Sequence, residues 1–155
     1  MSAGSPAQGV SAQGVSAAER VEDKSRPVKV MVIDDSKTIR RTAETLLTKA
    51  GYEVITATDG FESLSRIVDQ APDIIFVDIM MPRLDGYQTC ALIKRNAVFK
   101  KTPVVMLSSK DGLFDRARGR IVGSDQYLTK PFTREELLGA IERHLGVGKE
   151  VEPAK

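Results

Sequence analysis

The fold is decided by an apolar run that leads through two aspartates into an amphipathic segment, residues 28–51, which read VKVMVIDDSKTIRRTAETLLTKAG. Residues 28–33 have the length and the β-branched composition of a buried strand. The segment that follows ends at Gly51, a residue common just beyond the end of a helix. Its apolar residues keep helical spacing: Ile39, Ala43, Leu46, Leu47 and Ala50. The stretch therefore predicts a strand, an acidic loop and a helix.

The same order of strand and helix recurs along the chain. Four further runs have strand length and composition, namely residues 52–57, 74–77, 104–107 and 126–129. The third and fourth of the five runs are continuously apolar, as strands covered on both faces must be, whereas the second and fifth contain polar residues. We therefore expect a doubly wound α/β fold with a five-stranded parallel sheet and five helices, in which the second and fifth strands lie at the edges.

Helical periodicity follows the strands, with different strength in different places. Apolar residues mark the helices after the second, fourth and fifth strands, in that order: Phe61, Leu64, Ile67 and Val68; Phe114, Ala117 and Ile121; Leu137, Leu138, Ile141 and Leu145. Thr133 and Glu136 form a capping box that opens the last helix. Gly86 weakens the helix after the third strand, and Gly112 and Gly119 weaken the one after the fourth.

The composition is that of one globular domain with two tails. The chain has 155 residues, of which 41% are hydrophobic and 28% charged. Residues 1–27 are rich in Ser, Ala, Gly and Gln and contain a tandem repeat, so we expect a disordered tail, with a tether or docking peptide as the alternative. Residues 28–146 form the expected domain, and residues 147–155 a second tail.

Charge and hydropathy exclude several classes of function. A net charge of +2 provides no general attraction to nucleic acid or to anionic membranes. The single cysteine, Cys90, rules out an internal disulfide framework. No apolar run approaches the roughly 18 residues that a membrane span needs, and the N-terminal segment lacks the pattern of a secretory signal. We therefore expect a cytoplasmic protein.

Polar residues that could carry chemistry stand at the ends of the predicted strands. Asp34 and Asp35 follow the first strand, Asp78 the third, Ser108 the fourth and Lys130 the fifth. Each alone could be a helix cap or a turn residue. In a doubly wound sheet, however, the carboxyl ends of the strands meet at one site. Three carboxylates there would repel one another unless a cation neutralised them, and Mg²⁺ prefers such oxygen ligands, so the set predicts a phosphoryl-transfer site.

These motifs resemble the receiver domain of two-component response regulators. The resemblance rests on residues 30–36 (VMVIDDS), residues 77–82 (VDIMMP) with Asp85 and Gly86, then Ser108 and residues 130–132 (KPF). Asp78 follows Asp35 by 43 residues, Ser108 follows Asp78 by 30 and Lys130 follows Ser108 by 22, spacings similar to those of single-domain chemotaxis regulators. The resemblance implies a flavodoxin-like fold with strand order 2-1-3-4-5.

The resemblance also implies a role for each site residue. Asp78 is expected to accept a phosphoryl group from a partner histidine kinase, and Asp34 and Asp35 to hold Mg²⁺ together with Asp78 and the main-chain carbonyl of Met80. The implied role of Lys130 is to pair with the carboxylate and later with the phosphoryl group. Ser108 would bond a phosphoryl oxygen, and Tyr127 would be the aromatic switch. The Lys130–Pro131 bond is expected to be cis. For Tyr127, an edge-strand aromatic lying on the neighbouring helix is the alternative.

Output is expected to pass through the domain itself, since no segment after residue 146 could form an effector domain. The expected partner face combines the helix after the fourth strand, the fifth strand and the last helix, with Tyr127 and three arginines: Arg116, Arg118 and Arg120. Those arginines could instead be simply solvated. The N-terminal extension and residues 36–41 (SKTIRR) resemble the stand-alone regulators of type IV pilus chemosensory systems, which act in twitching motility.

Three other functions compete with this interpretation. A haloacid-dehalogenase-like, Mg²⁺-dependent phosphatase would need a second aspartate where Met80 stands. In a flavodoxin-like carrier the acidic loop formed by Asp34 and Asp35 would repel the FMN phosphate. A receiver that acts purely as a scaffold, without phosphorylation, is not distinguished by the sequence.

Overall fold

In the described part of the chain each strand is followed by a helix, and each of these helices begins at a side chain that caps its free backbone amides. In a computed structural model, which describes residues 26–109 and 114–146, the caps are Ser36, Asp59, Asp85, Asp115 and Thr133. The elements in chain order are β1 (Lys29–Ile33), α3 (Lys37–Lys49), β2 (Glu53–Ala57), α4 (Gly60–Gln70), β3 (Ile74–Asp78), α5 (Gly86–Arg95), β4 (Val104–Ser109), α6 (Arg116–Val122), β5 (Gln126–Lys130) and α7 (Arg134–Leu145).

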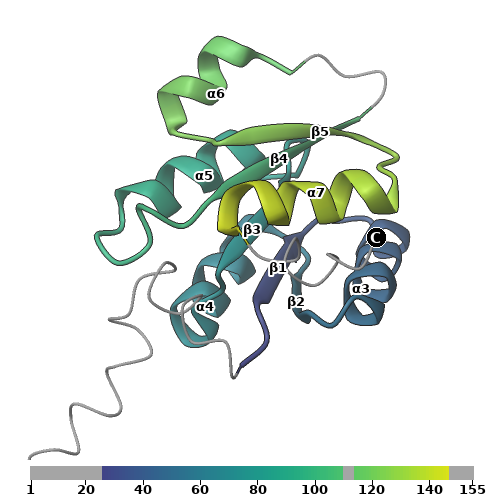
Figure 1. Ribbon diagram of the computed structural model, residues 1–155. Coiled ribbons are helices and arrows are strands. Elements are labelled where there is room, and N and C mark those ends of the chain that lie inside the picture. The colour runs from purple at the N-terminus through teal and green to yellow at the C-terminus, as the bar shows by residue number, and fades with distance from the viewer. Residues whose placement is uncertain (1–25, 110–113, 147–155) are drawn as a thin grey trace, which may run out of the picture.

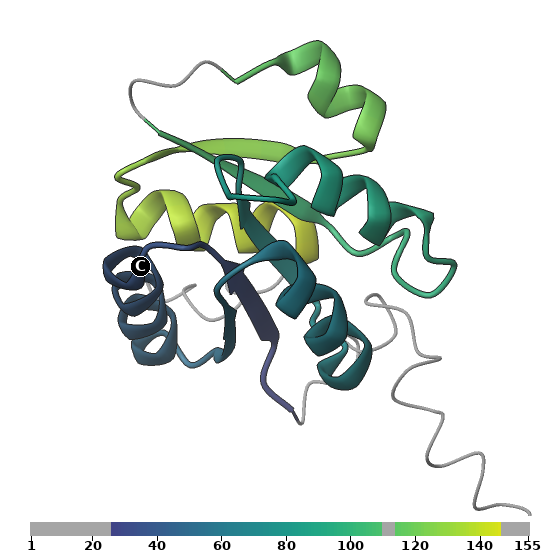
Figure 2. The same cartoon turned by 180° about the vertical axis from the view of Figure 1, so that it is seen from behind.

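The five strands form one parallel sheet in the order β2-β1-β3-β4-β5. This confirms the predicted fold, including the edge positions of β2 and β5. Helices α3 and α7 cover one face of the sheet, and α4, α5 and α6 cover the other (Figures 1 and 2). Along β1 the side chains alternate between the two layers, since Val30 and Val32 pack with α3 and α7 while Met31 and Ile33 pack with α4 and α5.

The core follows the continuously apolar strands. All five residues of β3 are buried, as are the first five of β4, whereas β2 and β5 are only partly covered. Gly51 has a φ of +96°, the left-handed conformation expected just beyond a helix end, and the capping box of Thr133 and Glu136 is present. None of the helices within the described ranges is long and apolar enough to cross a membrane.

Two helical stripes were predicted partly wrongly. On α4 the buried apolar side chain is Ile67, while Phe61 and Val68 are 54% and 44% exposed. On α6 the predicted apolar stripe included Ile121, but this residue is 83% exposed. Residues Gly119 and Val122 face the core instead, because Phe114 precedes the helix and packs back over its inner side.

One predicted strand boundary also needs a correction. Ser108 was expected to follow the fourth strand, but it lies within β4, and α6 begins only at Arg116. Gly112 lies outside the described residues, as do the tails except for Arg26 and Pro27. Arg26, assigned to the N-terminal tail, donates two hydrogen bonds to the buried carboxylate of Asp73, at 3.0 and 3.2 Å.

Candidate functional site

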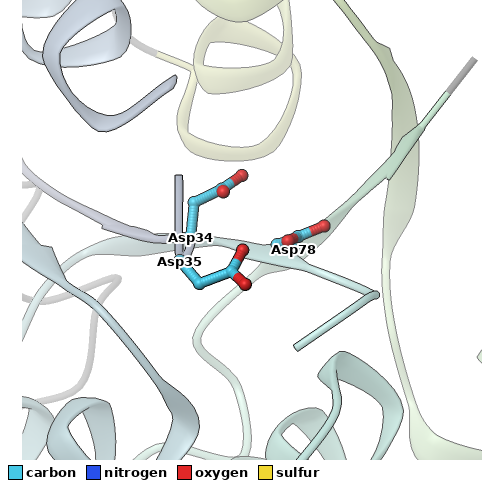
Figure 3. Close-up of side chains that lie close together, drawn as sticks. All are labelled: Asp34, Asp35 and Asp78. Carbon is cyan, nitrogen blue, oxygen red and sulfur yellow. The ribbon is translucent and has the colours of Figure 1, made fainter. Parts of the chain in front are cut away.

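Three aspartates converge at the carboxyl end of the sheet. Asp34 and Asp35 follow β1, and Asp78 is the last residue of β3, the strand that pairs with β1. One carboxylate oxygen from each lies within 4.8 Å of the others. Figure 3 shows the three side chains close together at the ends of these strands. The convergence follows from the strand order, because neighbouring parallel strands end at the same edge of the sheet.

Two of these carboxylates are buried, and burial raises the pKa of both. Asp34 is fully buried and Asp78 is 2% exposed, whereas Asp35 is exposed. Burial and the neighbouring charge of Asp34 raise the pKa of Asp78 to about 6, although the ammonium group of Lys130 lowers it. Burial likewise raises the pKa of Asp34 above 3.8. The cluster therefore concentrates negative charge at an energetic cost, which a bound cation would relieve.

Lys130 supplies one positive charge to this cluster. Its side chain reaches from the end of β5 and donates hydrogen bonds to Asp34 Oδ2 at 3.2 Å and to Asp78 Oδ1 at 3.1 Å. Burial favours its neutral form, but the two carboxylates outweigh burial and raise the pKa of Lys130 above its ordinary value. The lysine therefore stays charged. The next peptide bond, Lys130–Pro131, is cis, as predicted.

Backbone groups hold the two buried carboxylates in place. The amide of Met80 donates to Asp78 Oδ1 at 3.3 Å, and the amide of Ser36 donates to Asp34 Oδ1 at 2.8 Å. The side chain of Met80 points away from the core and is 69% exposed. Three carboxylates with one ammonium leave a net negative site built from hard oxygen donors. That donor set fits a divalent cation that prefers oxygen ligands.

The predicted hydroxyl and switch residues lie on β4 and β5. Ser108 is 5% exposed, and its hydroxyl donates to the carbonyl of Ser109 at 3.4 Å. It follows Leu107, which pairs with Asp78 across the sheet, so the serine stands beside the acidic cluster. Tyr127 is half-buried, and its hydroxyl accepts a hydrogen bond from Arg116 Nη2 at 3.0 Å.

The three arginines of the predicted partner face do not behave alike. Arg116 is held by Tyr127, and Arg118 Nη2 lies 3.6 Å from Asp85 Oδ2, so neither is simply solvated. Arg120 is exposed and borders a shallow cleft of about 370 Å³ between α6 and β5, which Arg116 and Tyr127 also line. This side of the domain therefore carries positive charge around an aromatic side chain.

The sequence analysis missed Tyr87, the second residue of α5. Its ring is 5% exposed and lies 6.0 Å from that of Phe114, which in turn stacks on Tyr127 at 4.3 Å. The hydroxyl of Tyr87 accepts a hydrogen bond from the amide of Asp115 at 2.9 Å. The sequence offered one signal for Tyr87, an aromatic residue directly after Asp85 and Gly86. Its partners lie 27 or more positions away in the chain, so no local pattern indicated them.

Comparisons with known proteins identify the family of the domain. Residues 30–142 match the response regulator receiver domain. Over 125 residues the chain is 75% identical to Protein PilG of Pseudomonas aeruginosa, covering 81% of this chain and 93% of that protein. It is also 38% identical over 109 residues to the alkaline phosphatase synthesis transcriptional regulatory protein PhoP of Bacillus subtilis, but spans only 45% of that relative's length.

Solved structures agree in fold. The chemotaxis protein CheY4 of Vibrio cholerae is 35% identical with a TM-score of 0.73, and the match covers 77% of this chain and all of that one. The receiver domain of the sensor histidine kinase PA1611 of Pseudomonas aeruginosa, solved with a magnesium ion in its active site cleft, is 27% identical with a TM-score of 0.71; the match covers 78% of this chain and 99% of that one. Given the matched residues and the acidic site at the strand ends, the chain belongs to the response regulator receiver family.

Proposed function

We propose that Asp78 accepts a phosphoryl group from a phosphohistidine on a partner kinase. The observation that carries this proposal is the buried carboxylate of Asp78 beside two further carboxylates and the ammonium group of Lys130. A structural ion pair would need one carboxylate for one lysine, and the surplus of negative charge is costly in a buried site. Such a surplus is useful where a cation and a phosphoryl group bind together.

The cation that we propose is Mg²⁺. Asp34, Asp35 and Asp78 would hold it, with the main-chain carbonyl of Met80 as a fourth protein ligand. Mg²⁺ keeps part of its water shell and binds phosphate oxygens, so when bound it would neutralise charge on the transferred group. Two observations support the choice: the all-oxygen donor set of this chain and the magnesium ion in the related PA1611 receiver domain.

The chain's own groups suggest how transfer proceeds. Both hydrogen bonds described for the Asp78 carboxylate reach Oδ1, so we assign the attack on phosphorus to Oδ2. A bond forms between Oδ2 and phosphorus, the bond between phosphorus and the histidine nitrogen of the donor breaks, and the imidazole keeps that electron pair. Lys130 stabilises the developing negative charge, and the hydroxyl of Ser108 donates to a phosphoryl oxygen after transfer.

For the output we propose a change in the surface formed by α6, β5 and α7. Movement of Ser108 toward the phosphoryl group would let Tyr127 move inward and reshape the surface that carries Arg116, Arg118 and Arg120. The positive charge of that surface fits a partner with acidic groups, and such binding weakens with added salt. The chain then acts as a signalling protein with no separate substrate to turn over.

The biological setting that we propose is a chemosensory system that controls type IV pilus twitching motility, in the cytoplasm. Two observations support it. The sequence resembles the stand-alone regulators of such systems, and the chain is 75% identical to Protein PilG over 93% of that relative. A match of that extent leaves the relative no room for an additional domain of ordinary size.

Incubation with phosphoramidate, whose P–N bond mimics that of phosphohistidine, tests the proposal by intact-protein mass spectrometry. We expect one added phosphoryl group that depends on Mg²⁺ and is absent from Asp78→Asn. The matched control is Asp69→Asn, which changes an exposed aspartate of α4 and should be phosphorylated like the unaltered chain. Equal phosphorylation of Asp78→Asn would move the acceptor elsewhere, and no phosphorylation of any variant would favour the scaffold.

A further inference from the structure

The first turn of α5 is fixed against the backbone of the proposed acceptor. The amide of Gly86 donates to the carbonyl of Ile79 at 2.9 Å. A Cβ added at Gly86 would lie 2.5 Å from the carbonyl oxygen of Asp78, so only glycine allows this approach. Tyr87 is the next residue. Its position therefore follows any displacement of the Asp78 backbone.

Tyr87 and Asp85, which lies two residues earlier, contact the start of α6. The Tyr87 hydroxyl accepts from the amide of Asp115, the residue that caps α6. The guanidinium of Arg118 lies over the Tyr87 ring, 4.4 Å from its centroid, and its Nη2 is 3.6 Å from Asp85 Oδ2. A hydrogen bond, a cation–π contact and an ion pair thus join the first turns of two helices.

Phe114 extends this connection to the fifth strand. Its ring lies between those of Tyr87 and Tyr127, with centroid distances of 6.0 and 4.3 Å. The ring fits over α6 because Gly119 has no side chain; a Cβ there would lie 2.6 Å from Phe114 Cζ. On its far side Tyr127 is bound by Arg116, another residue of α6.

The contacts of this aromatic cluster oppose the inward movement of Tyr127 that is proposed above. Met106 pairs with Tyr127 across the sheet, and alternation along β4 puts Ser108 on the same face as Met106. A movement of Tyr127 toward Ser108 therefore has to break the stack with Phe114 and the hydrogen bond from Arg116. Both contacts therefore belong to the arrangement in which Tyr127 has not moved inward.

We propose that Tyr87, Phe114 and Arg118 form a latch that holds α6 and Tyr127 in the unphosphorylated arrangement, with Tyr87 as its positioning residue. The inference rests on the proposed function, because it names the contacts that phosphorylation of Asp78 must open. Contacts made in only one of two states shift the equilibrium toward that state. They thereby lower the apparent affinity of any ligand that binds the other state. The latch therefore lowers affinity for a phosphoryl group at Asp78.

Tyr87→Phe tests the latch by removing one hydroxyl and keeping the ring. The loss of one hydrogen bond of ordinary net strength changes an equilibrium constant about 2- to 10-fold. We expect beryllofluoride, a phosphoryl mimic, to bind Tyr87→Phe more tightly than the unaltered chain by that factor in the presence of Mg²⁺, as measured by NMR titration. Phe114→Leu, which removes the stack but stays apolar, should shift affinity in the same direction.

The matched control is Tyr52→Phe, the same chemical change next to β2, the strand at the opposite edge of the sheet. It should leave the affinity for beryllofluoride unchanged. Equal or weaker binding by both latch variants, with binding by the unaltered chain intact, would overturn the latch alone. Absence of beryllofluoride binding by the unaltered chain would overturn the proposed function and the latch with it. A purely structural role for Tyr87 would lower thermal stability without raising affinity.

Discussion

Replacing the proposed acceptor by its amide isostere, Asp78→Asn, should make the metal-free protein more stable. The change removes one negative charge from a site where Asp34 and Asp78 are both buried and share a single ammonium group. A rise in the pKa of Asp78 from 3.8 to about 6 corresponds to roughly 3 kcal/mol of destabilisation at neutral pH. Because the amide must also find hydrogen-bond partners, we expect a net gain of about 1–3 kcal/mol in the free energy of unfolding.

The sign of the pH dependence follows from the direction of that shift. Between the unfolded and folded pKa values of Asp78, 3.8 and about 6, the folded chain binds more protons than the unfolded chain. Stability of the unaltered protein should therefore fall as pH rises through this window, and the cost is fully present above it. The amide introduced by Asp78→Asn cannot titrate, so the advantage of this variant should be near zero at the acid end and largest at neutral pH.

Urea denaturation in EDTA, and again with Mg²⁺, measures both effects. A cation that binds only the folded chain adds about 2.7 kcal/mol when its concentration is one hundred times its dissociation constant. Asp78→Asn loses a metal ligand, so Mg²⁺ should stabilise this variant less than the unaltered chain. Mg²⁺ should therefore reduce or reverse the difference in free energy of unfolding between the two proteins. A variant that is less stable than the unaltered chain in EDTA at neutral pH, or an equal response to Mg²⁺, would refute this reasoning.

Two further predictions concern the metal and the packing of α6. Asp35→Ala should weaken Mg²⁺ binding by at least about 10-fold in a calorimetric titration, since the loss of even an outer hydrogen-bond partner of a metal ligand costs about that much. The free energy of unfolding in EDTA should change little because Asp35 is exposed. Unchanged Mg²⁺ affinity would place the metal elsewhere. Gly119→Ala should destabilise the protein by about 1–2 kcal/mol in thermal unfolding because the added Cβ collides with Phe114. The matched control is Gly139→Ala in α7, where the added Cβ meets open space, and this variant should be more stable by about 0.5–1 kcal/mol. Equal effects of the two alanines would exclude the collision.

Local patterns were sufficient to predict most of the fold. The alternation of apolar runs with helical stripes fixes which segments form strands, and the polar residues of β2 and β5 identify them as edges. The convergence of Asp34, Asp35 and Asp78 could be inferred from the general rule that the site of a doubly wound sheet lies at the carboxyl ends of its strands. The strand order that places β1 beside β3 came from the resemblance to receiver domains.

Features that depend on contacts between distant segments could not be predicted in this way. Helical spacing on α4 does not reveal that Phe61 stays exposed, because only the packing of neighbouring helices decides how much of a stripe is covered. The core side of α6 was misassigned since Phe114 folds back onto Gly119 from outside the helix. Tyr87 was missed because its role arises from partners on other elements, which no local periodicity encodes.

The most direct test of phosphoryl transfer to Asp78 is to locate the phosphate in the sequence. After reaction with phosphoramidate and Mg²⁺, borohydride reduces an aspartyl phosphate to homoserine, and tandem mass spectrometry of the digested protein then identifies the altered position. We predict that Asp78 alone is converted to homoserine, with no conversion when Mg²⁺ is withheld. Conversion at Asp34 or Asp35, or a phosphate retained on a histidine or serine instead, would contradict the account.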